Sequence, residues 1–375
     1  MPVLIRSLEI LALLGALGFP VNLLLLTRID RMPGRWRVSA RLLLAPVTGL
    51  AVFSVFTGFY YATKLPVANT AFSYWLLLAV LWFIALLDWW RTTPMRWPFR
   101  PNKQAAMSHG LVVLCLTLIL AFYLRPFWQD PSLVFWHYAG SDGYMYMRIA
   151  EHVASHGTGV IPTLGPFDGA SGFVAEEMRH FHNGTFIDKP GTMSTLAGLS
   201  ALLSLTTLET FSPLTIAALA MMGSVLIVFG QSLLRLPLWA SLGFSVLGTL
   251  AMPVWMLSTY TFYGNILALP FYPLILVAIR PVTTLRTSIY VGLLLAGQTL
   301  LFPDGELVMI GVLLVTLPFL AWKAWKRQRV RQLLYASSIT IGTVILLVAP
   351  FGRGLYNTTF SRLLSVLSAA PRNAI

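Results

Sequence analysis

The chain has 375 residues, of which 57% are hydrophobic and only 10% are charged, and its formal net charge is +13. Soluble domains carry roughly 25% charged residues, so this composition excludes a water-soluble fold, which would expose far too much apolar surface. The single cysteine, Cys115, excludes an intramolecular disulfide and a cysteine metal cluster. The composition therefore predicts an all-α, polytopic bundle of transmembrane helices.

Apolar runs of membrane-spanning length recur from one end of the chain to the other. A bilayer core about 30 Å thick needs roughly 20 mostly apolar residues per helix. We expect about ten spans, the first of which is a membrane helix and not a cleaved signal peptide. The expected spans are 4–27, 40–62, 71–89, 109–124, 213–234, 238–257, 264–279, 287–302, 306–322 and 333–350.

Basic loops set the expected orientation, because short loops rich in Lys and Arg stay in the cytoplasm. The arginine-rich segment 28–41 follows the first span, so the N-terminus is predicted to lie outside. A short apolar stretch, 192–208, decides the rest of the topology. If it crossed, the basic segment 323–331 would face outward. If it is instead a juxtamembrane or re-entrant helix, segment 323–331 stays in the cytoplasm. Of the 13 acidic residues, only Asp30 and Asp88 then lie on the cytoplasmic side.

The first large external loop gathers most of the chemistry-bearing side chains, and its residues 137–191 hold five of the six histidines. Its segment from Asp142 to Gly157 predicts a short amphipathic helix that stops at the glycine. Three apolar residues share one stripe at a spacing of four: Met145, Ile149 and Val153. Such a helix would lie on the membrane with this stripe down and hold Asp142 near the interface. A plain helix N-cap is the alternative role of Asp142.

Four short motifs follow one another within residues 109–351: Gly140-Ser-Asp-Gly-Tyr144, Arg148-Ile-Ala-Glu-His152, Lys189-Pro-Gly191 and Phe302-Pro-Asp-Gly-Glu306. This layout resembles the GT-C superfamily of polytopic membrane glycosyltransferases, in which the first long external loop supplies a catalytic Asp and short juxtamembrane helices. The chain departs from many members in one respect, because its loop follows the fourth span and theirs follows the first.

The resemblance implies a division of the chain. Residues 1–108 would form an N-terminal three-helix membrane region, and 109–351 a GT-C-like catalytic core. The core includes the external loop 125–191 and the juxtamembrane helix 192–208. Residues 352–375 would form an external C-terminal tail.

The resemblance also implies the activity, which is transfer of a sugar from a polyprenyl-phosphate donor to a glycan, lipid or protein acceptor. The reaction would take place at the outer face of the cytoplasmic (inner) membrane, among membrane lipids and without nucleic acid. Asp142 is the expected catalytic base. The expected substrate-binding residues are Arg148, Arg179, Lys189, Tyr263, Asn265, Asp304 and Glu306. Headgroup contact for the basic residues and an aromatic-belt position for Tyr263 are the alternatives.

A divalent metal is a further alternative, and no cofactor is obligatory in this interpretation. The candidate ligands are His180, His182, Glu176 and Glu177, although none of the tight zinc spacings is present. Two rival functions stay open. One is an ion-coupled transporter or a lipid-linked-sugar flippase, which would place ionisable residues near the bilayer midplane. The other is a non-catalytic scaffold of an envelope assembly, with the large loop as its docking surface.

Overall fold

The structure is a computed structural model that describes residues 2–26, 34–92, 103–130, 133, 142–157, 190–251, 254, 263–279, 284–303, 305–326 and 328–351. Within these ranges the chain forms helices joined by short connections, without any β-strand. The elements are α1 (Pro2–Leu25), α2 (Gly34–Ala62), η1 (Val67–Asn69), α3 (Thr70–Thr92), α4 (Lys103–Gln129), α5 (Asp142–His156), α7 (Pro190–Leu203), α8 (Thr207–Ser232), α9 (Leu238–Leu250), α11 (Tyr263–Ala268), α12 (Phe271–Ile279), α13 (Leu285–Leu301), α14 (Gly305–Lys326), α15 (Val330–Val348) and η4 (Ala349–Phe351). The predicted all-α class is confirmed.

Six helical segments among the described residues are long and apolar enough to cross a membrane: Pro2–Leu25, Ala40–Ala62, Val67–Arg91, Ala106–Gln129, Thr207–Ser232 and Val330–Phe351. Three shorter apolar segments accompany them: Leu238–Leu250, Tyr263–Ile279 and Leu285–Leu301. The second of these falls into α11 and α12 because Pro270, which has no N–H to donate, follows Leu269 between them. The fold is that of a multi-helix membrane protein.

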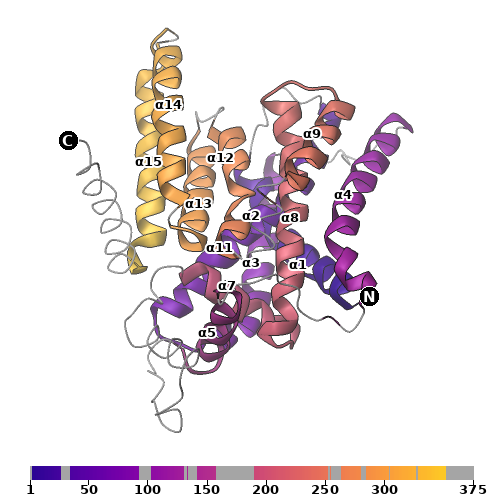
Figure 1. The fold of residues 1–375 in the computed structure, drawn as a ribbon. Helices are drawn as coiled ribbons and strands as arrows, with labels where there is room; N and C mark the ends of the chain where they lie inside the picture. The colour runs from indigo at the N-terminus through magenta and orange to yellow at the C-terminus, as the bar shows by residue number, and fades with distance from the viewer. Residues whose placement is uncertain are drawn as a thin grey trace, which may run out of the picture.

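The long helices run side by side, so the connections gather at two ends of the bundle (Figure 1). The basic end is where the α3 carboxylate of Asp88 meets the α13 guanidinium of Arg286, with N–O distances of 2.8 Å. Arg286 also donates to the carbonyl oxygen of Leu24 at 3.4 Å, which brings the end of α1 to the same place. The α5 end is the opposite end, where α5 and α7 lie together (Figure 1).

The first two helices pack unusually closely. A Cβ atom built on Gly18 would overlap the backbone of Ala45, and one on Gly49 would overlap the backbone of Leu14. Only glycine permits this approach of two helix backbones, which is how small residues drive helix association in membranes.

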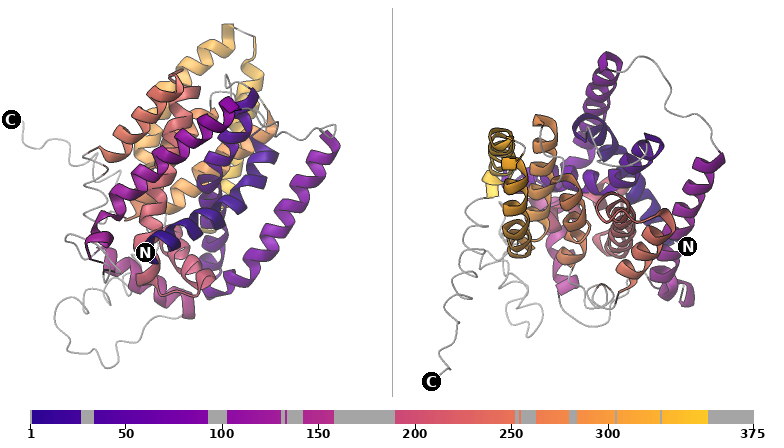
Figure 2. Two further views of the ribbon diagram at one scale, coloured as in Figure 1. Left: turned by 90° about the vertical axis from the view of Figure 1, so that its right-hand side faces the viewer. Right: turned by 90° about the horizontal axis from the view of Figure 1, so that it is seen from above.

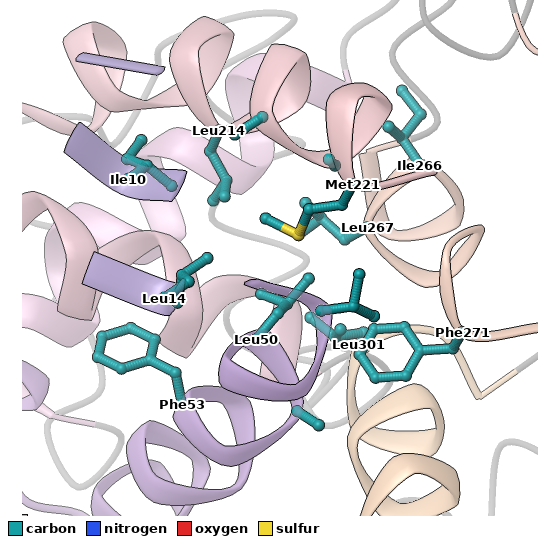
Figure 3. Close-up of a cluster of buried hydrophobic side chains, with 14 of the residues drawn as sticks. Ile10, Leu14, Leu50, Phe53, Leu214, Met221, Ile266, Leu267, Phe271 and Leu301 are labelled. Carbon is teal, nitrogen blue, oxygen red and sulfur yellow. The ribbon is translucent and has the colours of Figure 1, made fainter. Parts of the chain in front are cut away.

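The helix α2 lies at the centre of the bundle and contacts α1, α7, α8 and α13. Figure 3 shows the apolar cluster around it, with Leu50 and Phe53 of α2 facing side chains of the other helices. The labelled partners are Ile10, Leu14, Leu214, Met221, Ile266, Leu267, Phe271 and Leu301. The expected boundary at residue 108 stays a prediction, but the segments on its two sides share one hydrophobic core.

Three elements form the outer flanks. Seen from above, α14 and α15 lie at one side of the bundle, and α4 lies at the other (Figure 2). Large apolar side chains are exposed on these flanks and on α3, among them Phe72, Val315 and Leu346. Exposed aliphatic and aromatic side chains around a helix bundle are the surface that lipid tails cover.

The predicted juxtamembrane helix 192–208 is observed as α7, which runs from Pro190 to Leu203, and α8 then begins at Thr207. The earlier start of α8 has a clear cause, because Thr206 and Glu209 form a reciprocal capping box. Pro213, expected to begin the next span, therefore lies inside α8.

Candidate functional site

Four chain segments meet at the α5 end: the starts of α5, α7 and α11 and the end of α13. The helix α5 packs against α7, α8 and η1, and α11 contacts α7, α8 and α13. These segments come from positions as far apart as Asp142 and Leu301. The bundle thus brings the start of the predicted catalytic helix close to two segments that adjoin sequence motifs, the start of α7 and the end of α13. It also brings it close to α11, which carries Tyr263 and Asn265.

The first turns of α5 are held by aromatic rings. The ring of Tyr146 lies 5.9 Å from that of Tyr263 on α11, measured between centroids. The other neighbour of Tyr263 is Phe211 on α8, stacked at 4.1 Å with an interplanar angle of 20°. Such pairs contribute about 0.5–1.5 kcal/mol beyond the area they bury.

The far end of α5 is held by a backbone contact. Gly157 follows the helix with φ +69°, a left-handed conformation that ends helices and favours glycine. A Cβ on Gly157 would collide with the carbonyl oxygen of Lys64 and with Leu65, in the turn after α2. The predicted stop at this glycine is confirmed, and α5 is anchored at both of its ends.

The apolar stripe of α5 faces protein and not lipid, which corrects the expected surface-helix arrangement. Ile149 is 6% exposed and Val153 is 1% exposed, and both lie in the same core cluster as α7 and α8. The spacing of four residues predicted an apolar stripe on α5, but the same spacing is expected whether the stripe packs against lipid or against protein. The side chain of Met145, the third member, lies outside the described residues.

The start of α7 is tied to its neighbours by buried hydroxyl groups. Thr192 Oγ1 donates to the carbonyl oxygen of Leu301, in the last turn of α13. The hydroxyl of Thr57 on α2 donates to Ser194 at 3.1 Å, and Ser54 and Thr195 share a hydrogen bond of 3.0 Å. Hydrogen bonds between small polar side chains fix helices against one another where no water is present.

The exposed face of α5 carries charged and titratable groups. Arg148 and Glu151 form an ion pair of 3.2 Å, and both side chains are more than half exposed. The rings of His152 and His156 stack at 4.9 Å, and Ser155 Oγ lies 2.7 Å from His156 Nδ1. This face therefore presents charged and polar groups, while the opposite face packs on the bundle.

The expected site residues are placed as follows. Asp142 is the first residue of α5, and its side chain lies outside the described part. Tyr263 is fully buried, and its hydroxyl forms no hydrogen bond with any described residue. Asn265 is half-buried in α11, and Glu306 belongs to the first turn of α14, with a side chain that is not described. The remaining substrate-binding candidates, Arg179, Lys189 and Asp304, lie outside the described residues.

The described ranges contain no group of three or more His, Cys, Asp or Glu side chains that could hold a metal. All four metal candidates, His180, His182, Glu176 and Glu177, lie outside these ranges. The metal alternative therefore stays a prediction.

Two residues that hold the site are absent from the sequence expectations, Tyr146 and Phe211. Tyr146 lies four residues after Asp142, a spacing that puts both on one side of a helix. Phe211 lies two residues after Glu209, the second member of the Thr206 capping box. These spacings place each residue within its own helix, but they do not predict that both rings contact Tyr263, which depends on the tertiary fold.

The fold and the site together define a polytopic, all-helical membrane protein with two short helices packed across one end. No protein-family model matches the chain, and no curated protein or solved structure matches it either.

Proposed function

We propose that this chain is a membrane glycosyltransferase that moves a sugar from a polyprenyl-phosphate donor to an acceptor hydroxyl at the α5 end. The convergence of α5, α7, α11 and the α13–α14 connection is the observation that carries the proposal. Asp142 begins α5, and Tyr146, one turn later, reaches Tyr263. Gly191 lies against Leu300, so the Lys189 motif and the Phe302 motif also adjoin.

The proposal includes about ten spans, with the α5 end outside the cytoplasmic membrane. Its support is the separation of charge between the two ends. Arg91, Arg286 and Arg329 lie at helix termini of the basic end, which matches the cytoplasmic side by the positive-inside rule. In this topology α7 does not cross, and its position beside α5 at the α5 end supports this arrangement (Figure 1).

In the proposed reaction the Asp142 carboxylate takes the proton of the acceptor hydroxyl. The acceptor oxygen bonds to the anomeric carbon as the bond from that carbon to the phosphate oxygen breaks, and polyprenyl phosphate leaves. Arg148, Arg179 and Lys189 would hold the phosphate, because guanidinium and ammonium groups stabilise the charge that develops there. Arg148 suits this role because it lies on the exposed face of the helix that Asp142 begins.

The transporter alternative has less support. Buried polar side chains of the described spans are Ser, Thr, Asn and Gln, and none of the described buried residues is a carboxylate or a cation. Ion-coupled carriers use ionisable groups at the midplane. Carriers often bind their substrate at a broken transmembrane helix. Among the described residues, the break between α11 and α12 is the feature that a carrier would share.

The experiment is a transfer assay in proteoliposomes that contain the purified chain, polyprenyl-phosphate sugars and a panel of glycan and lipid acceptors, with and without a chelator. Sugar transfer with release of polyprenyl phosphate supports the proposal. If the donor reaches the opposite leaflet intact and no polyprenyl phosphate is released, the flippase alternative would replace the glycosyltransferase proposal. A donor that neither reacts nor moves would favour the scaffold.

A further inference from the structure

Three aromatic rings from distant parts of the chain form one buried stack at the α5 end. Tyr146 belongs to α5, Tyr263 to α11 and Phe211 to α8, and the consecutive centroid distances are 5.9 Å and 4.1 Å. The three side chains are between 0% and 9% exposed. The stack therefore connects the start of α5 to the long, buried helix α8.

Tyr146 is the member of the stack that lies on the same helix as the predicted base, Asp142. It lies one helical turn after Asp142, and the rise over four residues is about 6 Å. Residues i and i+4 lie on one side of a helix, so the contact of the Tyr146 ring fixes the turn that carries Asp142. The second anchor of α5, Gly157 against Lys64, lies at the far end of the helix. Between the two anchors, Ile149 and Val153 are buried in the core, so loss of the ring contact should loosen chiefly the first turn of α5.

We propose that Tyr146, Tyr263 and Phe211 act together as positioning residues that hold the first turn of α5, which begins at Asp142, for proton transfer by that residue. This inference rests on the proposed function. It also changes the role expected for Tyr263, whose ring packs against Phe211 and Tyr146 and is not open to a sugar. Tyr263 then acts through Asp142. A misplacement of about 1 Å costs on the order of 100-fold in rate, which sets the expected effect.

The test uses four variants of the full chain in proteoliposomes. Phe211→Leu and Tyr146→Leu remove one ring each, whereas Tyr146→Phe keeps the ring. Phe229→Leu is the matched control, because Phe229 lies in the last turns of the same helix α8 and stacks on Phe244 at 6.2 Å and 18°. It removes a partly buried stacked ring at the basic end of the same helix.

Kinetics separate positioning from general destabilisation. We expect Phe211→Leu and Tyr146→Leu to lower kcat on the order of 100-fold with KM nearly unchanged, the pattern of an interaction realised in the transition state. Tyr146→Phe should restore most of the rate. Phe229→Leu should lower the melting temperature and leave kcat near that of the original chain. An equal loss of kcat in Phe229→Leu would overturn the positioning role.

A double variant tests whether the stack acts through Asp142. In the Asp142→Asn background, Phe211→Leu should not lower the residual rate further, because coupled residues are not additive. A further loss of the full single-variant size would overturn the inference.

Hydrogen exchange separates failure of this inference from failure of the proposed function. The amides of α5 should exchange faster in Phe211→Leu than in Phe229→Leu, whether or not the chain transfers sugar. If the original chain has no transferase activity, the proposed function fails and the exchange of α5 still tests the stack. Unchanged exchange in Phe211→Leu would overturn the positioning role.

Discussion

Thr192 Oγ1 on α7 donates a hydrogen bond to the carbonyl oxygen of Leu301, in the last turn of α13. Carbonyls in the last turn of a helix have no N–H partner within that helix, so a side chain from elsewhere satisfies this one. The bond holds the start of α7, which follows Lys189, beside the Phe302 motif. Two of the segments that the proposed function requires to adjoin are thus joined by one buried hydroxyl.

Substitution of Thr192 by Val keeps the shape of the side chain and removes its hydroxyl. We expect a loss of stability of about 1 kcal/mol, the usual net contribution of one buried hydrogen bond. The measurement is the thermal unfolding temperature of the purified protein in detergent. Thr215→Val is the control. The Thr215 hydroxyl donates to the carbonyl oxygen of Phe211 within the same helix, so its loss leaves the backbone hydrogen bonds of that helix in place. Equal destabilisation by the two variants would contradict a special role for the Thr192 bond.

Substitution of Gly49 by Ala tests the close packing of α1 and α2. The added Cβ would overlap the backbone of Leu14, which no side-chain rearrangement can relieve. Overpacking costs typically about 1–3 kcal/mol, so we expect lower yield of folded protein and a lower unfolding temperature. Gly110→Ala is the matched control in another long helix, since a Cβ there meets no atom within 4 Å. A neutral Gly49→Ala would show that the two helices do not approach as described.

Labelling of introduced cysteines tests the proposed topology. The background requires only Cys115→Ala, because the chain has one cysteine. An impermeant thiol reagent applied outside intact cells should label Ser155→Cys in α5 and Leu208→Cys at the start of α8. It should label Arg329→Cys only after permeabilisation.

Positions 155 and 208 flank α7, so their common labelling is the signature of a helix that does not cross. Opposite labelling of these two positions would show that α7 crosses, and labelling of Arg329→Cys in intact cells would reverse the orientation. The experiment does not depend on any enzymatic activity.

Local sequence patterns predicted most single helices. The apolar stripe and Gly157 predicted α5, and the short apolar stretch 192–208 predicted α7. The start of α8 was predicted too late, because Pro213 suggested a boundary that the Thr206 capping box overrides. The break between α11 and α12 was not predicted, although Pro270 is its physical cause.

Tertiary relationships were less predictable for a physical reason. An apolar stripe such as that of Ile149 and Val153 has the same period against lipid and against protein, so its partner cannot be read from spacing. The stack of Tyr146, Tyr263 and Phe211 joins three helices that are far apart in the sequence. No local pattern encodes such a contact. The roles of the predicted site residues remain proposals that the experiments address.

Asp142→Asn in the transfer assay tests the central claim most directly. An amide cannot accept the acceptor proton as a carboxylate does, so we expect the rate to fall by 100-fold to 10,000-fold, roughly the range that general base catalysis contributes. Expression and unfolding temperature should stay unchanged. Glu9→Gln, which removes an ion-paired carboxylate from the first turns of α1, should retain normal turnover. Normal turnover in Asp142→Asn would contradict the account and remove Asp142 from the mechanism.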